Sequence, residues 1–390
     1  MRSPRWPSIV LVALLTSTAL WLFLASAPAA APVRRAAIGA LLLLNILTSY
    51  LTDSRFEIAA LLTLRPHTEE RTLSFQQEPL RLTLFYPGGK DVRGGLLLVN
   101  GAVERGNDEP AIRRVAISFA RLGFLVALPD LASLRAYRLD HDDPGRLTVA
   151  FAALRSDPVV TGKPIGLVGF CFGASLGLLA ASDPAVAGDV AFVAGAIPYA
   201  RLDTLIVDVL SHSAVGTAGV RPWEPRDDVQ AKLPLALIGL LGDEKDHEAL
   251  RDLLEHNALQ TGQADLSPAA EALRRLLLAR DRQEAEGLLA KQDPALLAAL
   301  RDLSPLPQLD GLRAPLFLFH SANDRVIPWE HSAALVEAAP SGGRLEVSTL
   351  LQHTRLVLDP SQWRLLLTYP RAAWELLLWL DQVLAAAGVR

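Results

Sequence analysis

The hydrophobic and polar positions of this chain follow one pattern up to about residue 65 and another beyond it. No charged residue occurs between Arg5 and Arg34. The core of this uncharged run, residues 9–27, is long enough at about 1.5 Å per residue to cross a hydrocarbon layer about 30 Å thick. The run therefore has the length and the composition of a membrane-spanning helix.

A second apolar run, 36–51, follows a turn rich in proline and alanine, so we expect residues 1–65 to form a membrane anchor. The expected anchor is a two-helix hairpin with helices at about 8–28 and 36–52. A cleaved signal peptide is the alternative, because Ala25-Ser26-Ala27 resembles a small-residue cleavage site. Against cleavage, the apolar stretch is longer than that of an ordinary signal peptide.

The arginines of this region indicate a side of the membrane. Arg34 and Arg35 lie in the loop of the expected hairpin, whereas the others lie outside it: Arg2, Arg5, Arg55 and Arg65. By the positive-inside rule, both ends of the hairpin and the rest of the chain would lie in the cytoplasm, at a bacterial-type inner or plasma membrane. A single anchor with the same N-terminal arginines would instead place the rest of the chain outside.

Beyond residue 65, short apolar runs alternate with amphipathic helices. Continuous apolar runs such as 95–99 are typical of strands that are buried on both faces. A helix with one apolar stripe follows Asp108, which can cap it, and ends at Gly123. The expected strands are 80–86, 95–99, 124–128, 165–170, 190–197, 315–320 and 344–350, with further helices near 147–154, from 330 and from about 363. Strands alternating with helices predict an α/β fold, a mostly parallel sheet with helices on both faces.

Residues 201–311 interrupt this alternation, since they are rich in Leu, Ala, Arg and Glu and lack clear β-branched runs. They predict a helical cap or lid inserted between two parts of a core, 66–200 and 312–390. Ligands bind at the C-terminal edge of such sheets, so we expect the insertion to lie over that edge. The alternative is an extra helical domain without contact to the chemistry.

Composition excludes several classes of protein. The chain has 390 residues, 38 basic and 42 acidic side chains and a net charge of −4, which does not favour nucleic-acid binding. Its single cysteine, Cys171, excludes an intramolecular disulfide and a zinc site built from cysteines. His247 and His256 do not share the i, i+4 face of a helical zinc pair. We expect no metal and no organic cofactor.

The strand 165–170 runs into Gly169-Phe170-Cys171-Phe172-Gly173, the pattern of a nucleophile elbow. Such an elbow needs small residues two positions before and after the nucleophile, because the chain reverses there in a strained turn. Ser175 is the alternative nucleophile, since it also stands in a G-x-S-x-G pattern. The nucleophile must directly follow the strand, however, and Ser175 would lie a full turn inside the helix. We therefore prefer Cys171, although a free cysteine can also be a simple buried apolar residue.

An acid and a histidine follow later in the chain, in the order that is typical of folds with a nucleophile elbow. Asp324 lies in the loop after the expected strand 315–320, and His353 follows the last expected strand. Taken singly, Asp324 can be a turn residue and His353 a solvated loop residue. Together with Cys171 they predict a catalytic triad.

On these residues, the chain resembles the α/β-hydrolase fold and, within it, the dienelactone hydrolase family. That family also has cysteine in its elbow, as in 169–173 here. Its acid-bearing loop reads H-G-x-x-D-x-x-V/I-P, and residues 320–328 are similar to it, with Ser321 in place of glycine. The resemblance covers about residues 70–200 and 312–385.

The loop after strand 95–99 is expected to complete the site. The backbone N–H of Phe172, with that of Ala102 or Val103, would bind the oxyanion of a tetrahedral intermediate. The resemblance implies a glutamate in this loop and makes Glu104 an accessory candidate, with an exposed loop carboxylate as the alternative.

The residue types lead to a functional hypothesis. The chain is expected to be a membrane-anchored carboxylic ester or lactone hydrolase with a Cys-His-Asp triad and an acyl-thioester intermediate. Its partners would be a small ester, lactone or acyl substrate and the lipid bilayer. Two alternatives stay open: an acyl-thioesterase or lipid-acyl esterase with the same triad, and an inactive hydrolase fold that serves as a binding or scaffold protein.

Overall fold

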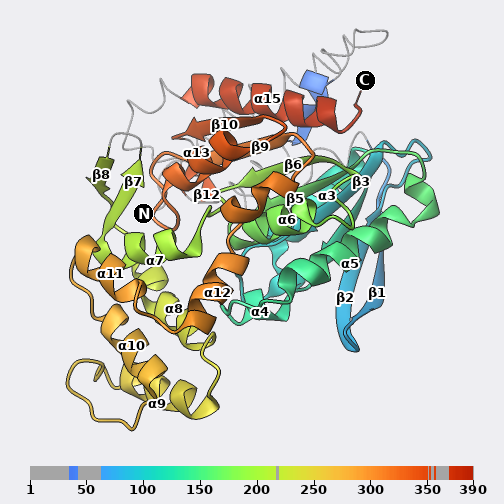
Figure 1. Ribbon diagram of the computed structural model, residues 1–390. Coiled ribbons are helices and arrows are strands. Elements are labelled where there is room, and N and C mark those ends of the chain that lie inside the picture. The colour runs from blue at the N-terminus through green and yellow to red at the C-terminus, as the bar shows by residue number, and fades with distance from the viewer. Residues whose placement is uncertain are drawn as a thin grey trace, which may run out of the picture.

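An eight-stranded sheet forms the centre of the computed structural model (Figure 1). The structure describes residues 35–42, 63–216, 219–349, 351–352, 355–356 and 369–389. The strands of the sheet are β1 (His67–Phe75), β2 (Glu78–Tyr86), β3 (Gly94–Val99), β4 (Phe124–Pro129), β5 (Ile165–Phe170), β6 (Val190–Ala196), β9 (Leu316–Ser321) and β10 (Gly343–Ser348). Their order across the sheet is β1-β2-β4-β3-β5-β6-β9-β10. Strands β1 and β2 are antiparallel to their neighbours, and all pairs from β4 to β10 are parallel.

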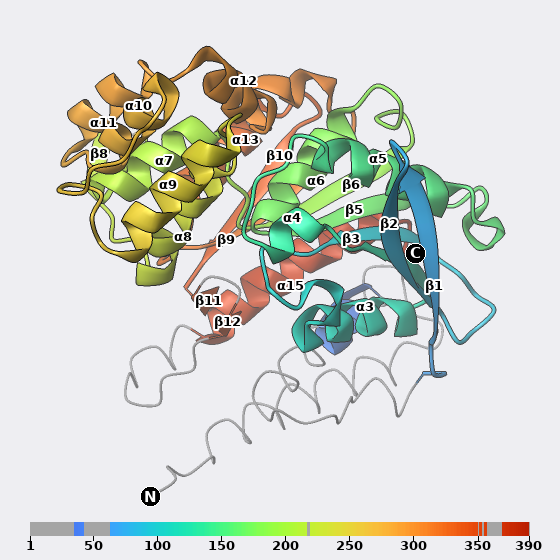
Figure 2. The ribbon, with the colours of Figure 1, turned by 90° about the horizontal axis from the view of Figure 1, so that it is seen from below.

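Helices cover both faces of the sheet (Figure 2). Helices α3 (Pro110–Arg121) and α15 (Tyr369–Ala386) lie on one face, and α5 (Asp143–Arg155) and α6 (Phe172–Ser182) lie on the other. Alternate residues of β3 enter different cores: Leu97 and Val99 pack with α5 and α6, whereas Leu96 and Leu98 pack with α3 and α15. This double burial is the reason for the continuous apolar character of residues 95–99.

The helix α3 does not use Asp108 as its cap, contrary to expectation. Its N-cap is Glu109, which makes no side-chain capping bond, and Pro110 is the first helical residue. Proline suits this position because its missing N–H would have no partner there. The carboxylate of Asp108 instead lies 3.3 Å from Arg81 and 3.5 Å from Arg113. The end of the helix at Gly123, whose φ is +97°, is as predicted.

Residues 35–42 are helical and pack against α15. Ile38 and Leu42 are buried in the same core as Leu380 and Leu384, and Arg35 Nε lies 2.9 Å from Asp381 Oδ1. The first part of the expected second membrane helix is therefore packed on the protein, since an apolar run of this length suits a buried helix as well as a membrane span.

The expected first membrane helix, 8–28, and residues 43–52 of the second lie outside the described residues. Among the helices of the described ranges, none combines the length and the apolar character that a membrane crossing requires.

The insertion between β6 and β9 is mostly helical and lies beside the C-terminal end of β5 (Figures 1 and 2). Its helices are α7 (Leu202–Ser211), α8 (Asp227–Ile238), α9 (Glu244–Glu255), α10 (Pro268–Leu277), α11 (Arg282–Leu289) and α12 (Pro294–Asp302). It also contains a small antiparallel pair that the sequence did not predict, β7 (Ser213–Gly216) and β8 (Gly219–Pro222).

A buried ion cluster joins the insertion to the core helix α13 (Trp329–Ala338). Asp208 of α7 binds Arg282 of α11, and its second oxygen lies 3.1 Å from His331 Nε2. The other ring nitrogen of His331 accepts a hydrogen bond from the backbone N–H of Ala200 at 3.0 Å, so Nε2 carries the proton that faces Asp208. The cluster fixes α7 to the core.

Candidate active site

The turn between β5 and α6 holds Cys171 in an unusual backbone conformation. Its φ is +51° and its ψ is −128°, a region that residues other than glycine rarely adopt. The turn is kept in place by a hydrogen bond of 2.8 Å from the N–H of Cys171 to the carbonyl of Ala196 on β6. Such strain concentrates at functional sites, and here it directs the side chain into a cavity.

The two glycines around Cys171 are required by close backbone contacts. A Cβ at Gly173 would lie 2.8 Å from the carbonyl carbon of Asn100 and closer still to its oxygen. A Cβ at Gly169 would lie 2.8 Å from the backbone nitrogen of Ala174. Only glycine fits at either position, which explains the small residues of the elbow.

Ser175 lies inside α6 and has a structural role. Its side chain is fully buried. Its hydroxyl donates to the carbonyl of Tyr199 at 2.9 Å and accepts from the N–H of Tyr199 at 2.8 Å. The proton is thus bound to a backbone carbonyl, and the residue does not line the cavity that contains Cys171.

Asp324 lies in the loop between β9 and α13, only 4% exposed. Its Oδ1 accepts hydrogen bonds from the N–H groups of Val326 at 2.7 Å and Ile327 at 2.9 Å. Its carbonyl accepts one from Trp223 Nε1 at 2.6 Å. These bonds fix the loop. The expected base, His353, lies outside the described residues.

The loop after β3 approaches the elbow closely. Asn100 fixes its shape, because its Oδ1 accepts from the N–H of Gly101 at 2.9 Å and its Nδ2 donates to the carbonyl of Gly106 at 2.8 Å. A Cβ at Gly101 would lie 3.3 Å from the Cβ of Cys171, so glycine allows the two segments to come together.

The expected oxyanion groups gather around the cavity. Ala102, Val103 and Phe172 all line it together with Cys171. Within the described part of the chain, no hydrogen bond is formed by the N–H of any of these three residues. Donors of this kind are available to a developing negative charge. Glu104, the accessory candidate, is exposed and lies outside the cavity lining.

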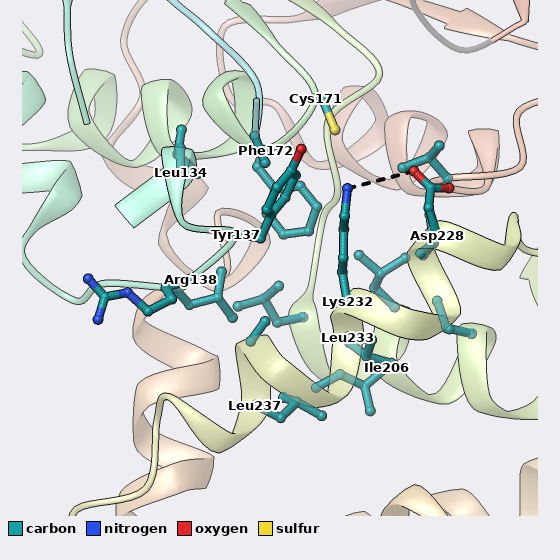
Figure 3. A pocket seen from close by; sticks show the side chains of 18 of the residues that line it. Leu134, Tyr137, Arg138, Cys171, Phe172, Ile206, Asp228, Lys232, Leu233 and Leu237 are labelled. Atoms are coloured by element: carbon teal, nitrogen blue, oxygen red, sulfur yellow. Dashed lines mark ion pairs between the residues drawn. The ribbon is translucent and has the colours of Figure 1, made fainter. Parts of the chain in front are cut away.

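The cavity has a volume of about 410 Å³ and lies between the elbow and the insertion (Figure 3). This is a normal size for a small-molecule site. Most of its lining is apolar, and half of the lining residues come from α7 and α8, with contributions from α4 (Ala132–Arg135) and the segment after it. The charged side chains in the lining are Arg138, Arg226, Asp228 and Lys232.

Three of these charges lie together at the N-terminal end of α8. Arg226 binds Asp228 through two hydrogen bonds of 2.7 and 2.6 Å. This bonding lowers the pKa of Asp228. It also raises the pKa of Arg226, to which the nearby charges of Asp324 and Cys171 add. Lys232 Nζ lies 4.0 Å from Asp228 and 3.6 Å from the ring centre of Tyr137. With the nearby carboxylate of Asp324, the two positive and two negative charges balance.

Sequence reasoning did not find this charged group or the α8 lining. The apolar spacing Leu202, Leu205, Ile206 and Val209 was visible as one face of a helix, but nothing in it says what that face covers. Tyr137 has a φ of +52°, a conformation that could not be predicted from its residue type.

The sequence profile of the dienelactone hydrolase family matches residues 103–208, from the loop after β3 through the elbow to α7. A search of curated proteins found no match. Among solved structures, acylaminoacyl peptidase from Pyrococcus horikoshii is similar at 13% identity and a TM-score of 0.47, covering 77% of this chain and 40% of that chain. This chain thus spans less than half the length of that peptidase.

Two further solved structures are similar. Dienelactone hydrolase from Anabaena variabilis has 15% identity and a TM-score of 0.42, covering 78% of this chain and 95% of that chain. The 2,6-dihydroxy-pseudo-oxynicotine hydrolase has 14% identity and a TM-score of 0.48, covering 97% of this chain and 87% of that chain. With the elbow and the sheet order, the family match supports an enzyme of the α/β-hydrolase superfamily that acts on ester bonds.

Proposed function

We propose that this chain is a carboxylic ester or lactone hydrolase of the dienelactone hydrolase type, with Cys171 as nucleophile, His353 as base and Asp324 as the acid that orients it. The observation that carries the proposal is the strained elbow. It presents the only cysteine of the chain to a cavity whose lining includes three residues with N–H groups that form no hydrogen bond within the described ranges. A purely structural cysteine would need neither the strain nor the donors.

In the proposed reaction, His353 accepts the thiol proton and the sulfur of Cys171 attacks the carbonyl carbon of the ester. The carbonyl oxygen becomes an oxyanion, which accepts hydrogen bonds from the N–H of Phe172 and from that of Ala102 or Val103. The carbon–oxygen ester bond then breaks, and protonated His353 gives its proton to the leaving alkoxide.

The acyl group is now a thioester on the cysteine sulfur. His353 takes a proton from water, and the resulting hydroxide attacks the thioester carbonyl through a second oxyanion. The thiolate leaves and the carboxylic acid is released. Cys171 directly precedes α6, so it stands at the N-terminal end of this helix.

An acyl-thioesterase or lipid-acyl esterase is the second candidate. The apolar walls from α7 and α8 favour it, because they suit an acyl chain better than a small polar lactone. The triad and the two half-reactions would be the same, with a thiol or a lipid alcohol as the leaving group.

Membrane attachment through residues 8–28 is also part of the proposal. Its support is the uncharged run between Arg5 and Arg34. As a single span preceded by Arg2 and Arg5, this helix would place the rest of the chain outside the cytoplasm by the positive-inside rule. Carbonate extraction of membranes that contain the full chain tests the attachment, and protease protection in right-side-out and inverted vesicles tests the side. Release by carbonate would contradict the anchor.

The triad is tested with the full chain, para-nitrophenyl acetate and iodoacetamide. Because Cys171 is the only cysteine, each incorporated label reports on it alone. We expect Cys171→Ala to abolish hydrolysis, and His353→Ala to reduce both hydrolysis and the rate of labelling. Ser175→Ala should retain hydrolysis. Full activity in Cys171→Ala would refute the cysteine mechanism, and labelling independent of His353 without any hydrolysis would favour a scaffold protein.

A further inference from the structure

In the cavity beside Cys171, the lining residues of α8 change from charged to apolar along the helix. Asp228, Val229, Lys232, Leu233 and the pair at 236–237 line it over successive turns. At about 1.5 Å per residue, the distance along the helix from Asp228 to Leu237 is about 13 Å. One face of α8 thus forms a long wall of the cavity.

The N-terminal end of this wall is fixed beside the acid loop of the core. The N–H of Arg226 donates to the carbonyl of Arg325 at 2.8 Å. The side chain of Arg325 donates in return to the carbonyl of Glu224 at 3.0 Å. Asp324, next in the chain to Arg325, is bound by Trp223. The start of α8 therefore lies at the catalytic end, and the helix leads away from it.

The opposite wall comes from α7. Leu202, Leu205, Ile206 and Val209 line the cavity with the i, i+3, i+4, i+7 spacing of a single helical face, and each is at most 3% exposed. Since α7 is fixed by the buried ion cluster of Asp208, this wall is preformed.

The charged side chains of α8 and its N-cap gather at the catalytic end, whereas Arg138 of the facing segment lies beside Gly239, next to the other end of the helix. In Figure 3, the ammonium of Lys232 points toward Cys171 and Asp228, whereas Leu237 lies at the other end of the view with Leu233 and Ile206 between. Beyond Lys232, the residues of α7 and α8 that line the cavity are all apolar. No hydrogen-bonding group of these two helices is available there for a polar substituent.

We infer that α7 and α8 form an acyl-chain pocket, and that the substrates are esters or thioesters of straight-chain fatty acids of medium length. This rests on the proposed function and names its substrate class. The carbonyl is held at Cys171, and the chain extends along α8 toward Leu237. Burying each methylene group between these walls contributes about a fourfold gain in kcat/KM until the pocket is full.

The test measures kcat/KM of the full chain for para-nitrophenyl acetate, butyrate, octanoate and hexadecanoate. Ala236→Phe fills the apolar end of the pocket, and Leu233→Gln makes its wall polar at nearly constant volume. Ala231→Phe is the matched control, because residue 231 lies on the same helix but is exposed and does not line the cavity.

We expect octanoate to exceed acetate by at least about tenfold in the native chain. Ala236→Phe and Leu233→Gln should each lower the octanoate value about tenfold and leave the acetate value within about twofold, with Ala231→Phe unchanged throughout. Equal values for acetate and octanoate in the native chain, or an equal loss for both esters in the two pocket variants, would overturn the inference.

Calorimetric titration with octanoic acid and acetic acid separates the pocket from the chemistry. If the chain hydrolyses no ester but binds octanoic acid tightly, and Ala236→Phe weakens this binding, the pocket is supported and the proposed function fails. If the chain hydrolyses esters but binds octanoic acid no more tightly than acetic acid, the pocket is refuted and the proposed function stands.

Discussion

Replacing Gly173 with alanine should inactivate the enzyme far more than it destabilises the fold. The new Cβ would lie 2.8 Å from the carbonyl carbon of Asn100 and 3.0 Å from Val99 Cγ1. Val99 is the last residue of β3, and Asn100 is the first residue of the loop that follows it. Because Asn100 is bonded to Gly101 and Gly106, the clash moves the loop and the elbow apart. A displacement of about 1 Å between catalytic groups costs about a hundredfold in rate.

The stability cost should be smaller, because overpacking costs about 1–3 kcal/mol and alanine recovers some of this in backbone entropy. The assays are kcat/KM with para-nitrophenyl acetate and the free energy of unfolding by urea. Gly287→Ala is the matched control: residue 287 lies within α11, no atom is within 4 Å of its Cβ position, and stability should rise by about 0.5–1 kcal/mol without loss of activity. A Gly173→Ala enzyme with native kcat/KM would refute the role of the contact between elbow and loop.

Three further predictions concern buried polar groups. Ser175→Ala should lower the free energy of unfolding by about 1–3 kcal/mol and keep most activity, because it leaves the N–H and carbonyl of Tyr199 without their partner; a loss of activity without a loss of stability would contradict this. Arg282→Met should destabilise by about 3 kcal/mol, since Asp208 loses a buried partner, whereas Arg275→Met, which breaks an exposed pair with Glu271, should change stability by less than about 0.5 kcal/mol. Burial raises the pKa of Asp143 from 3.8 to about 6, so the folded protein binds this proton more tightly than the unfolded chain does. The free energy of unfolding should therefore fall by about 3 kcal/mol as the pH rises from below 4 to above 6. Asp143→Asn should remove this part of the pH dependence in urea titrations at pH 4 and pH 7, and an unchanged dependence would count against it.

The core of the fold could be predicted because its strands carry their signal locally. The expected strand 165–170 coincides with β5, since both of its faces are buried and every position is apolar or glycine. The edge strand β1 was missed for the opposite reason. Its sequence, HTEERTLSF, is polar and mostly exposed, so no alternation of apolar residues indicates a strand.

The parts of the candidate site that directly follow the ends of predicted strands could be predicted from the sequence. The prediction of an enzyme that acts on ester bonds is confirmed by the family match. Cys171 rather than Ser175 was preferred because the nucleophile must follow the strand, and the structure places Cys171 at the turn and Ser175 inside α6. The roles of Cys171, Asp324 and His353 stay predictions.

The apolar cavity could not be predicted because it depends on how two helices pack against each other. The spacing along α7 defines an apolar face but does not say whether that face meets another helix, a sheet or a substrate. Likewise, residues 36–42 are apolar enough for a membrane and for a protein core, and only the packing against α15 separates the two.

The contacts of the insertion also determine which part of it can move. Opening α7 would expose Asp208, Arg282 and His331 and break a buried ion cluster, at a cost of several kcal/mol. The start of α8 is also held to the core, through the hydrogen bond from Arg226 to Arg325. Its next turn, however, meets the core segment after α4 through Lys232 and Tyr137, a cation–π contact worth about 0.5–2 kcal/mol. Substrate should therefore enter between α8 and Tyr137, where the charged residues of α8 lie, and the wall from α7 should stay in place throughout turnover.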